Sequence, residues 1–176
     1  RDVAGTTVCY AELGALCQEF AAVGVQDAPM AVLGGSARAL ALAVAVVYAG
    51  RPLVLLDPQL PTARLPHILQ TSGATSTIVD DEFQPLAVEI GAAGILPVTQ
   101  LWEDGLPWAG EVRRPGGSVP ATIVYTSGST GAPKGVVLSH AAVVNGAATS
   151  REEFGLRTSD VCAMLLPPAY AAGQEV

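Results

Sequence analysis

The sequence contains few charged side chains, since Lys, Arg, Asp and Glu make up only 14% of its 176 residues. Acidic residues outnumber basic ones, so the formal net charge at pH 7 is −7. Binding to nucleic acid or to an anionic membrane surface needs a basic face, and the nine Lys and Arg residues form no run. The composition therefore argues against both kinds of partner.

Cysteine is also scarce. The three cysteines, Cys9, Cys17 and Cys162, are an odd number, and none belongs to a C-x-x-C pattern. This spacing argues against a disulfide framework and against a zinc site. We expect reduced thiols in a cytoplasmic protein.

No hydrophobic run is long enough to cross a membrane. The longest, Ala39 to Ala49, is much shorter than the roughly 20 residues that a spanning helix needs. We expect it to form a buried helix instead. No signal peptide is apparent, and because the chain begins at Arg1 rather than at methionine, we expect it to be a piece of a longer polypeptide.

Half of the residues are hydrophobic, which excludes a disordered chain and predicts a well-buried core. Short apolar runs predict buried strands, and apolar residues at helical spacing predict helices between them. The predicted strands are residues 30–33, 53–56 and 77–79, with a further short strand within 91–98. The predicted helices are one that begins at Tyr10 and stops near Gly24, one over 37–48 that is capped by Ser36, and one that begins close to Pro66.

Two details of these helices can be predicted from single residues. A proline inside a helix costs about 3 kcal/mol, so the apolar pattern over 61–70 is expected to become helical only near Pro66. Cys9 stands three residues before Glu12, where a capping box would have Ser or Thr. A thiol is a weak acceptor, so this cap should be poor.

Strands that alternate with helices predict an α/β fold: a three-layer sheet of mostly parallel strands covered by helices, with right-handed crossovers. Residues 105–120 are rich in Gly and Pro and are expected to form a loop, a candidate boundary between sheet regions. Beyond it, Ser139 can cap a helix that runs to about Ala148, and residues 160–166 are expected to form a strand.

The stretch Y-T-S-G-S-T-G-A-P-K-G, Tyr125 to Gly135, lies between two apolar runs. Glycines let backbone amides approach a ligand closely, hydroxyls add donors and the lysine adds a positive charge, which together suit a polyphosphate. The stretch fits neither the P-loop pattern G-x-x-x-x-G-K-[ST] nor the dinucleotide pattern G-x-G-x-x-G. A surface linker of small residues is the alternative interpretation.

This stretch resembles the phosphate-binding signature of the adenylate-forming, AMP-binding superfamily, in particular that of the adenylation domains of nonribosomal peptide synthetases. Three further segments resemble core motifs of that family in the family's own order: Val8–Leu13, Ala49–Leu69 and Val137–Asn145. The second of them carries the D-P-x-x-P-x-x-R-L-x-x-I-L pattern that is typical of the peptide-synthetase branch. The resemblance covers essentially the whole chain and implies that residues 1–176 are the N-terminal portion of an adenylation domain, within the large N-terminal domain of such an enzyme.

The resemblance implies a reaction in which ATP activates a carboxylic acid as an acyl-adenylate, which is then loaded onto the phosphopantetheine thiol of a carrier protein. The setting would be nonribosomal peptide or hybrid polyketide synthesis of an antibiotic or other natural product, beside neighbouring synthetase domains. ATP and Mg²⁺ are the expected cofactors of the full-length domain. The residues that would hold the β- and γ-phosphates are Thr126, Ser127, Gly128, Ser129, Thr130, Gly131 and Lys134. His140 and Asn145 either join this site or simply begin the next helix.

The sequence departs from the family in two ways. The later segments that bind adenine and ribose, supply an acidic group for magnesium and carry a lysine for the transition state are absent from these 176 residues, so no catalytic residue is assigned and the isolated chain is predicted to be inactive. Amino-acid-activating members also carry an aspartate that pairs with the substrate ammonium, and Tyr170 or Ala171 stands there instead. An unpaired buried ammonium costs several kcal/mol, which disfavours an α-amino acid and leaves hydroxy, keto or aryl acids.

Three hypotheses follow from this resemblance. The chain is part of a working adenylation domain, or a degenerate remnant with a structural, domain-packing role, or part of an acyl-CoA synthetase. The retained lysine and glycines favour the first, the missing carboxylate and Pro66 favour the second, and the Ala49–Leu69 pattern argues against the third.

Overall fold

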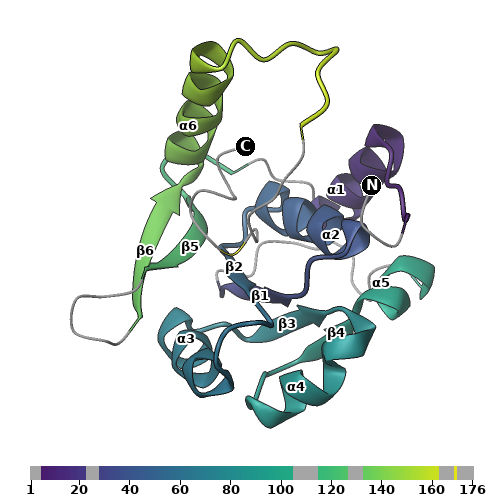
Figure 1. Ribbon diagram of the computed structural model, residues 1–176, viewed down its shortest axis with the longest axis vertical. Helices are drawn as coiled ribbons and strands as arrows, with labels where there is room; N and C mark the ends of the chain where they lie inside the picture. Colours follow the sequence, from purple (N-terminus) through teal and green to yellow (C-terminus); the bar gives the residue numbers. More distant parts are fainter. Residues whose placement is uncertain (1–4, 23–27, 105–114, 127–132, 163–168, 170–176) are drawn as a thin grey trace.

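A computed structural model describes residues 5–22, 28–104, 115–126, 133–162 and 169 (Figure 1). Several predictions made above concern residues outside these ranges. They are the helix stop at Gly24, most of the 105–120 loop, the five residues Ser127 to Gly131, and the substrate positions Tyr170 and Ala171. These remain predictions.

Within the described residues, a sheet of six strands forms the centre of the fold, and its order is β4-β3-β1-β2-β5-β6. The strands are β1 (Met30–Leu33), β2 (Leu53–Leu56), β3 (Ser76–Val79), β4 (Ile95–Pro97), β5 (Pro120–Thr126) and β6 (Lys134–Ser139). The pairings among β1 to β5 are parallel, and only β6 runs antiparallel to its neighbour β5. The predicted sheet of mostly parallel strands is therefore confirmed.

Helices cover both faces of the sheet (Figure 1). The helices α1 (Tyr10–Ala22), α2 (Ala37–Tyr48) and α5 (Val98–Asp104) enclose one half of the core, and α3 (Leu65–Ser72) and α4 (Gln84–Glu89) enclose the other. The short 3₁₀ turns η1 (Thr62–Arg64) and η2 (Asp81–Phe83) precede α3 and α4. The last helix, α6 (His140–Glu153), follows β6 directly and contains no buried residue.

Strand β1 shows why the sheet is buried on both faces. Met30 and Val32 belong to the half of the core beneath α1, α2 and α5, whereas Ala31 and Leu33 belong to the half beneath α3 and α4. None of these four side chains is exposed to solvent. Successive residues of a strand point to opposite faces, so an uninterrupted apolar run is what a strand covered on both sides requires.

Several local predictions are confirmed. Ser36 caps α2, because its hydroxyl oxygen accepts a hydrogen bond from the Ala39 N–H at 3.1 Å. Pro66 lies in the first turn of α3, after the separate turn η1. At α1 the Glu12 carboxylate accepts the Cys9 N–H at 2.7 Å, and this hydrogen bond is the main reason that the pKa of Glu12 is lowered. One half of the capping box is thus present.

Other local predictions need correction. The expected strand over 160–166 is wrong for residues 160–162, which have no regular secondary structure, and its other four residues lie outside the described ranges. Helix α6 continues to Glu153 rather than ending near Ala148. Helices α4 and α5 were not predicted at all. Both are short, and α4 carries a proline in its first turn, so neither produces a periodic apolar pattern long enough to stand out.

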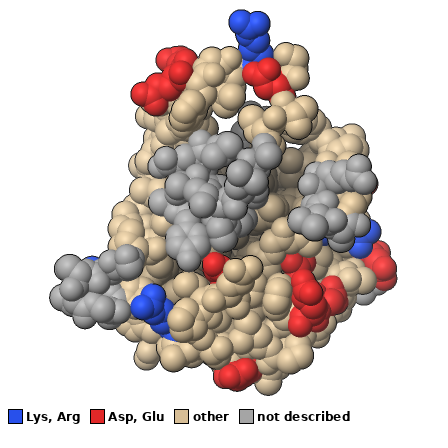
Figure 2. Space-filling view, viewed as in Figure 1, with Lys and Arg blue, Asp and Glu red and all other residues tan. Residues whose placement is uncertain are grey.

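The surface carries little charge of either sign. Figure 2 shows basic and acidic side chains scattered over one face, with no basic patch among the described residues of that face. Within those residues no helix is both long and apolar enough to cross a membrane, and no three His, Cys, Asp or Glu side chains converge on a point where a metal could bind. Cys9 and Cys162 are exposed, Cys17 is buried, and all three are free thiols.

Candidate phosphate-binding site

The glycine-rich stretch connects two adjacent antiparallel strands at the edge of the sheet. In the register of β5 and β6, Thr126 lies opposite Lys134 and Tyr125 lies opposite Gly135. The Thr126 hydroxyl is 3.5 Å from the main-chain oxygen of Lys134. The segment between them is thus closed at its base by paired strands. Of the seven residues predicted to bind phosphate, Thr126 and Lys134 belong to this base, and Ser127, Gly128, Ser129, Thr130 and Gly131 lie outside the described residues.

The two faces of this hairpin differ. Side chains alternate along a strand, so Thr126 and Lys134 share one face, and Tyr125 with Gly135 shares the other. Both Thr126 and Lys134 are exposed, so a hydroxyl and an ammonium group stand opposite each other in solvent at the base of the hairpin. A hydroxyl donor beside a positive charge is a suitable start for a site that binds phosphate oxygens.

Gly135 has a different role from the one expected of the glycines in this stretch. It lies within β6 and does not have a positive φ angle. A Cβ atom at this position would lie 3.1 Å from Cζ of Tyr125 and 3.2 Å from Cγ2 of Ile123, which is tighter than most Cβ contacts, so these side chains would have to shift by a few tenths of an ångström. The close approach of the Tyr125 ring therefore favours glycine at position 135.

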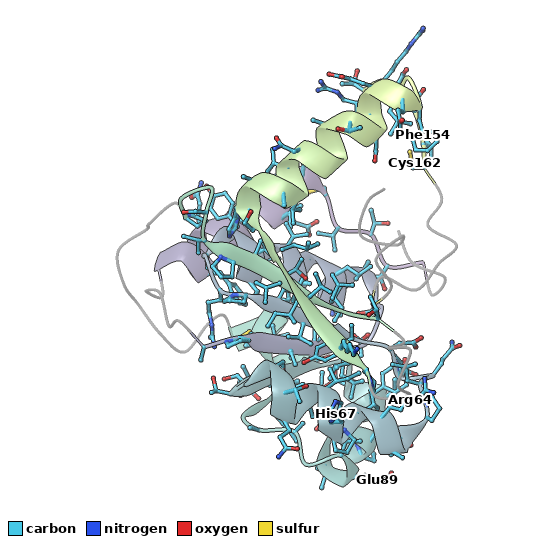
Figure 3. The ribbon with its side chains drawn as sticks, turned by 90° about the vertical axis from the view of Figure 1, so that its left-hand side faces the viewer. Arg64, His67, Glu89, Phe154 and Cys162 are labelled. Carbon is cyan, nitrogen blue, oxygen red and sulfur yellow. The ribbon has the colours of Figure 1, made fainter. Side chains whose placement is uncertain are left out.

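Helix α3 contacts both strands of the hairpin, and no sequence pattern predicts this contact. The Tyr125 hydroxyl lies 2.8 Å from the Thr71 hydroxyl and donates to the Ile68 main-chain oxygen at 3.2 Å. Directly before the other strand, the main-chain oxygen of Pro133 lies 3.2 Å from Nε2 of His67. Figure 3 shows His67 and Arg64 near the end of β6 that begins at Lys134. No local pattern could have revealed these contacts, because they join residues 54 to 66 positions apart.

His140 and Asn145 are not part of this base. His140 follows the last residue of β6, so six residues at about 3.3 Å each place it about 20 Å from Lys134. Its N–H donates to the Val119 main-chain oxygen, and its Nε2 atom is buried with no hydrogen-bond partner among the described residues. Burial lowers the pKa of His140, which favours a neutral ring. Asn145 is exposed on α6.

A second position in the fold has the topology of a ligand site. In open parallel sheets, ligands bind beyond the carboxyl ends of neighbouring strands whose following helices cover opposite faces. Strands β1 and β3 form such a pair here, because α2 and α4 lie on opposite faces. The buried Asp80 carboxylate fills this position and accepts the N–H groups of Gly35 and Ser36 at 2.9 Å each, and the Ser36 hydroxyl as well.

The N–H groups of this anion-binding turn therefore already have an acceptor within the protein. Gly34 has a φ of +146°, and a Cβ atom there would lie 2.2 Å from Oδ2 of Asp80, so the carboxylate packs directly on the glycine backbone. The sequence signal was present in the Gly-Gly-Ser turn before a helix and the aspartate that directly follows β3. With this position filled, the β5–β6 hairpin is the candidate site.

The described fold is a mostly parallel α/β sheet whose edge strands β5 and β6 flank the glycine-rich segment. The family model described as AMP-binding enzyme matches residues 2–176, and the chain belongs to this family. It is 37% identical to the phosphinothricin tripeptide synthetase PhsC of Streptomyces viridochromogenes, over 82% of this chain and 14% of that protein. It is 39% identical to nonribosomal peptide synthetase 1 of Ajellomyces capsulatus, over 64% of this chain and 7% of that protein.

Solved structures agree with this assignment. The o-succinylbenzoate coenzyme A synthetase MenE of Bacillus subtilis, in complex with ATP and magnesium ion, matches 97% of this chain with a TM-score of 0.79 and 25% identity. The match covers 47% of the MenE chain. The chain thus spans less than half of this structural relative and a small share of the curated peptide synthetases.

Proposed function

We propose that this chain supplies the phosphate-binding hairpin of an adenylation domain that activates a carboxylic acid with ATP. The observation that carries the proposal is the register that sets the exposed Thr126 hydroxyl opposite the exposed Lys134 at the base of the hairpin. The membership of the chain in the AMP-binding enzymes and its similarity to peptide synthetases support the same reading. The activity takes place in the cytoplasm, where the product is an intermediate of nonribosomal peptide or hybrid polyketide synthesis.

The proposed reaction has two steps. A carboxylate oxygen of the substrate attacks the α-phosphorus of ATP, the bond to the bridging oxygen breaks, and pyrophosphate leaves. The thiol of a carrier protein then loses its proton and attacks the acyl carbon, and AMP leaves. In the first step negative charge moves onto the departing pyrophosphate, so donors that surround its oxygens lower the barrier.

The chain's own residues have a limited part in this reaction. The Lys134 ammonium offsets charge on the β- and γ-phosphates, and the Thr126 hydroxyl donates to a phosphate oxygen. The backbone amides and hydroxyls of Ser127, Gly128, Ser129, Thr130 and Gly131 complete the set in the proposal. Magnesium is expected with ATP, but the described residues offer no cluster of three ligands for it, so this part of the chain contributes hydroxyl, amide and ammonium donors.

The acid that is activated depends on residues outside the described ranges. We propose that Tyr170 or Ala171 occupies the position of the ammonium-binding aspartate, so that a hydroxy, keto or aryl acid is preferred over an α-amino acid. The identities of 37% and 39% with peptide synthetases favour a carrier-protein thiol over coenzyme A as the acceptor.

The test is the binding of ATP to the 176-residue chain and to Lys134→Ala. We expect saturable binding in the millimolar range, because the adenine- and ribose-binding segments are absent, and no exchange of pyrophosphate into ATP. A charge-assisted hydrogen bond contributes about 1.5–3 kcal/mol, so Lys134→Ala should weaken binding about ten- to hundredfold. Binding that is unchanged in Lys134→Ala would contradict the proposal.

A structural role in packing against other synthetase domains is the second candidate. It is favoured by α6, which has no buried residue, by Val144 on this helix, which is 64% exposed, and by Phe154 directly after it, which is 75% exposed. A chain with only this role would show no saturable ATP binding, so the same titration separates the two candidates.

A further inference from the structure

We propose that α3 positions the phosphate-binding hairpin, with His67, Thr71 and Tyr125 as its positioning residues. This inference rests on the proposed function, because the hairpin is held in place for the sake of a phosphate ligand. None of the three residues is among those predicted to touch phosphate. They act through the main chain on each side of the segment that carries the predicted donors.

The hairpin needs support because the sheet supplies little of it. Strand β2 pairs with β5 only through Leu53 and Thr122, so the part of β5 from Ile123 to Thr126 has a strand neighbour on one side only. That neighbour, β6, is the last strand of the sheet. Figure 1 shows β5 and β6 running out past the end of β2 towards α3. Among the described residues, α3 contacts the end of the hairpin away from α6.

The β5 side is held by Tyr125. Its ring packs against the half of the core beneath α3, and its hydroxyl reaches the Ile68 main-chain oxygen at 3.2 Å and the Thr71 hydroxyl at 2.8 Å. The Thr71 hydroxyl is in turn 2.7 Å from the main-chain oxygen of His67. The hydroxyls of Thr71 and Tyr125 have one hydrogen each and make three short contacts between them. They therefore form a small hydrogen-bond network rather than one isolated bond.

The β6 side is held by His67. A main-chain oxygen can only accept, so the contact of 3.2 Å between Pro133 and His67 requires a hydrogen on Nε2 of the imidazole. Pro133 directly precedes Lys134, so this bond fixes the peptide that leads into the predicted phosphate-binding lysine. His67 and Thr71 stand four residues apart on α3 and therefore share one face of the helix.

The geometry also links the two sides to each other. Tyr125 lies opposite Gly135, and the absence of a side chain at Gly135 lets the ring cross the hairpin to reach α3. Movement of Tyr125 would therefore disturb β6 as well as β5. One turn of α3 thus holds both β5 and β6 where they meet the glycine-rich segment. The distance between Thr126 and Lys134 depends on this turn.

The test compares the 176-residue chain with Tyr125→Phe, Thr71→Val, His67→Leu and His67→Gln. Both substitutions are made at His67 because glutamine keeps a hydrogen-bond donor that leucine lacks. Gln70→Ala is the matched control, since Gln70 is exposed on the same helix. Amide hydrogen exchange is followed without nucleotide at Lys134 and Gly135, with β1 as the internal reference, and ATP affinity is measured for each variant.

We expect three- to tenfold faster exchange at Lys134 and Gly135 in Tyr125→Phe, Thr71→Val and His67→Leu, with β1 unchanged, as suits the loss of one hydrogen bond. ATP affinity should fall by a similar factor, and His67→Gln and Gln70→Ala should stay close to the unchanged chain. Unaltered exchange and affinity in all three variants, while the parent chain binds ATP, would overturn the inference. If exchange at Lys134 and Gly135 is faster in the three variants than in the parent chain, but the parent chain binds no ATP, the role of α3 is supported and the proposed function is contradicted.

Discussion

Asp80, the residue after β3, accepts a hydrogen bond from the backbone N–H of Ser36 at the start of α2, with 2.9 Å between Oδ2 and N. The amino end of a helix attracts negative charge, because its first N–H groups have no partner within the helix. A carboxylate from another strand meets that need here. The turn after β1 is therefore part of the structural core of the domain, and the phosphate site that we propose is the β5–β6 hairpin.

Removal of the Asp80 carboxylate should destabilise the fold. Asp80→Ala removes the acceptor of three part-buried hydrogen bonds, from the N–H groups of Gly35 and Ser36 and from the Ser36 hydroxyl, and a hydrogen bond to a charged group contributes about 1.5–3 kcal/mol. We expect the free energy of unfolding in urea to fall by about 2–4 kcal/mol, and by less in Asp80→Asn, which keeps one oxygen. Glu89→Gln, at an exposed acid on α4, is the control and should change nothing (Figure 3). Equal stability of Asp80→Ala and Glu89→Gln would contradict this account.

Two glycine substitutions should act in opposite directions. Gly34→Ala places a Cβ atom 2.2 Å from Oδ2 of Asp80 at a φ of +146°, so we expect a loss of more than about 3 kcal/mol or no folded protein. Gly14→Ala lies in α1 with nothing within 4 Å of the added atom, and alanine is the better helix former by about 1 kcal/mol. Thermal unfolding should therefore show a lower melting temperature for the first variant and an equal or higher one for the second. A stable Gly34→Ala chain would be inconsistent with the close contact to Asp80.

Stability should fall in mild acid, partly through His140. Burial lowers the pKa of this histidine in the folded chain, so between its folded and unfolded pKa values the unfolded state binds more protons. Its contribution to stability is therefore complete above the unfolded value, near 6.5, and is lost as the pH falls through the folded value. Urea unfolding at pH 7.5 and pH 5.5 should show a smaller decrease for His140→Gln than for the parent chain. An identical decrease in both would show that His140 contributes nothing to the pH dependence.

The three thiols should differ in reactivity. Cys9 and Cys162 are exposed, whereas Cys17 is buried, and burial raises the pKa of its thiol. The thiolate is the reactive form, so a thiol reagent at neutral pH should modify two cysteines quickly and the third only on unfolding. Peptide mapping after a short exposure identifies the sites. Early modification of Cys17 would mean that α1 opens readily from α2.

The elements that the sequence predicts well are those with local causes. Apolar runs define β1 and β2, Ser36 defines the start of α2, and Pro66 places the first turn of α3. The antiparallel direction of β6 can also be predicted from the sequence. The connection of residues 127–133 is too short for a crossover to a parallel strand, which takes a dozen residues or more.

The features that sequence alone could not supply depend on distant contacts. Asp80 meets Gly35 across 45 positions, and His67 meets Pro133 across 66. From the sequence alone, each of these residues would be interpreted as an ordinary surface residue. Only the order of the strands brings β3 beside β1 and sets α3 against the hairpin, so such contacts follow from the topology and not from a local pattern.

The most direct test of the central claim is to locate where phosphate binds on the 176-residue chain. Backbone amide chemical shifts are followed by NMR during separate titrations with tripolyphosphate and with adenosine. The account predicts that tripolyphosphate shifts Thr126, Lys134 and their neighbours, that Lys134→Ala abolishes these shifts, and that adenosine causes none. Shifts confined to Gly35 and Ser36, or an equal response to adenosine, would contradict the assignment of the β5–β6 hairpin as the phosphate site.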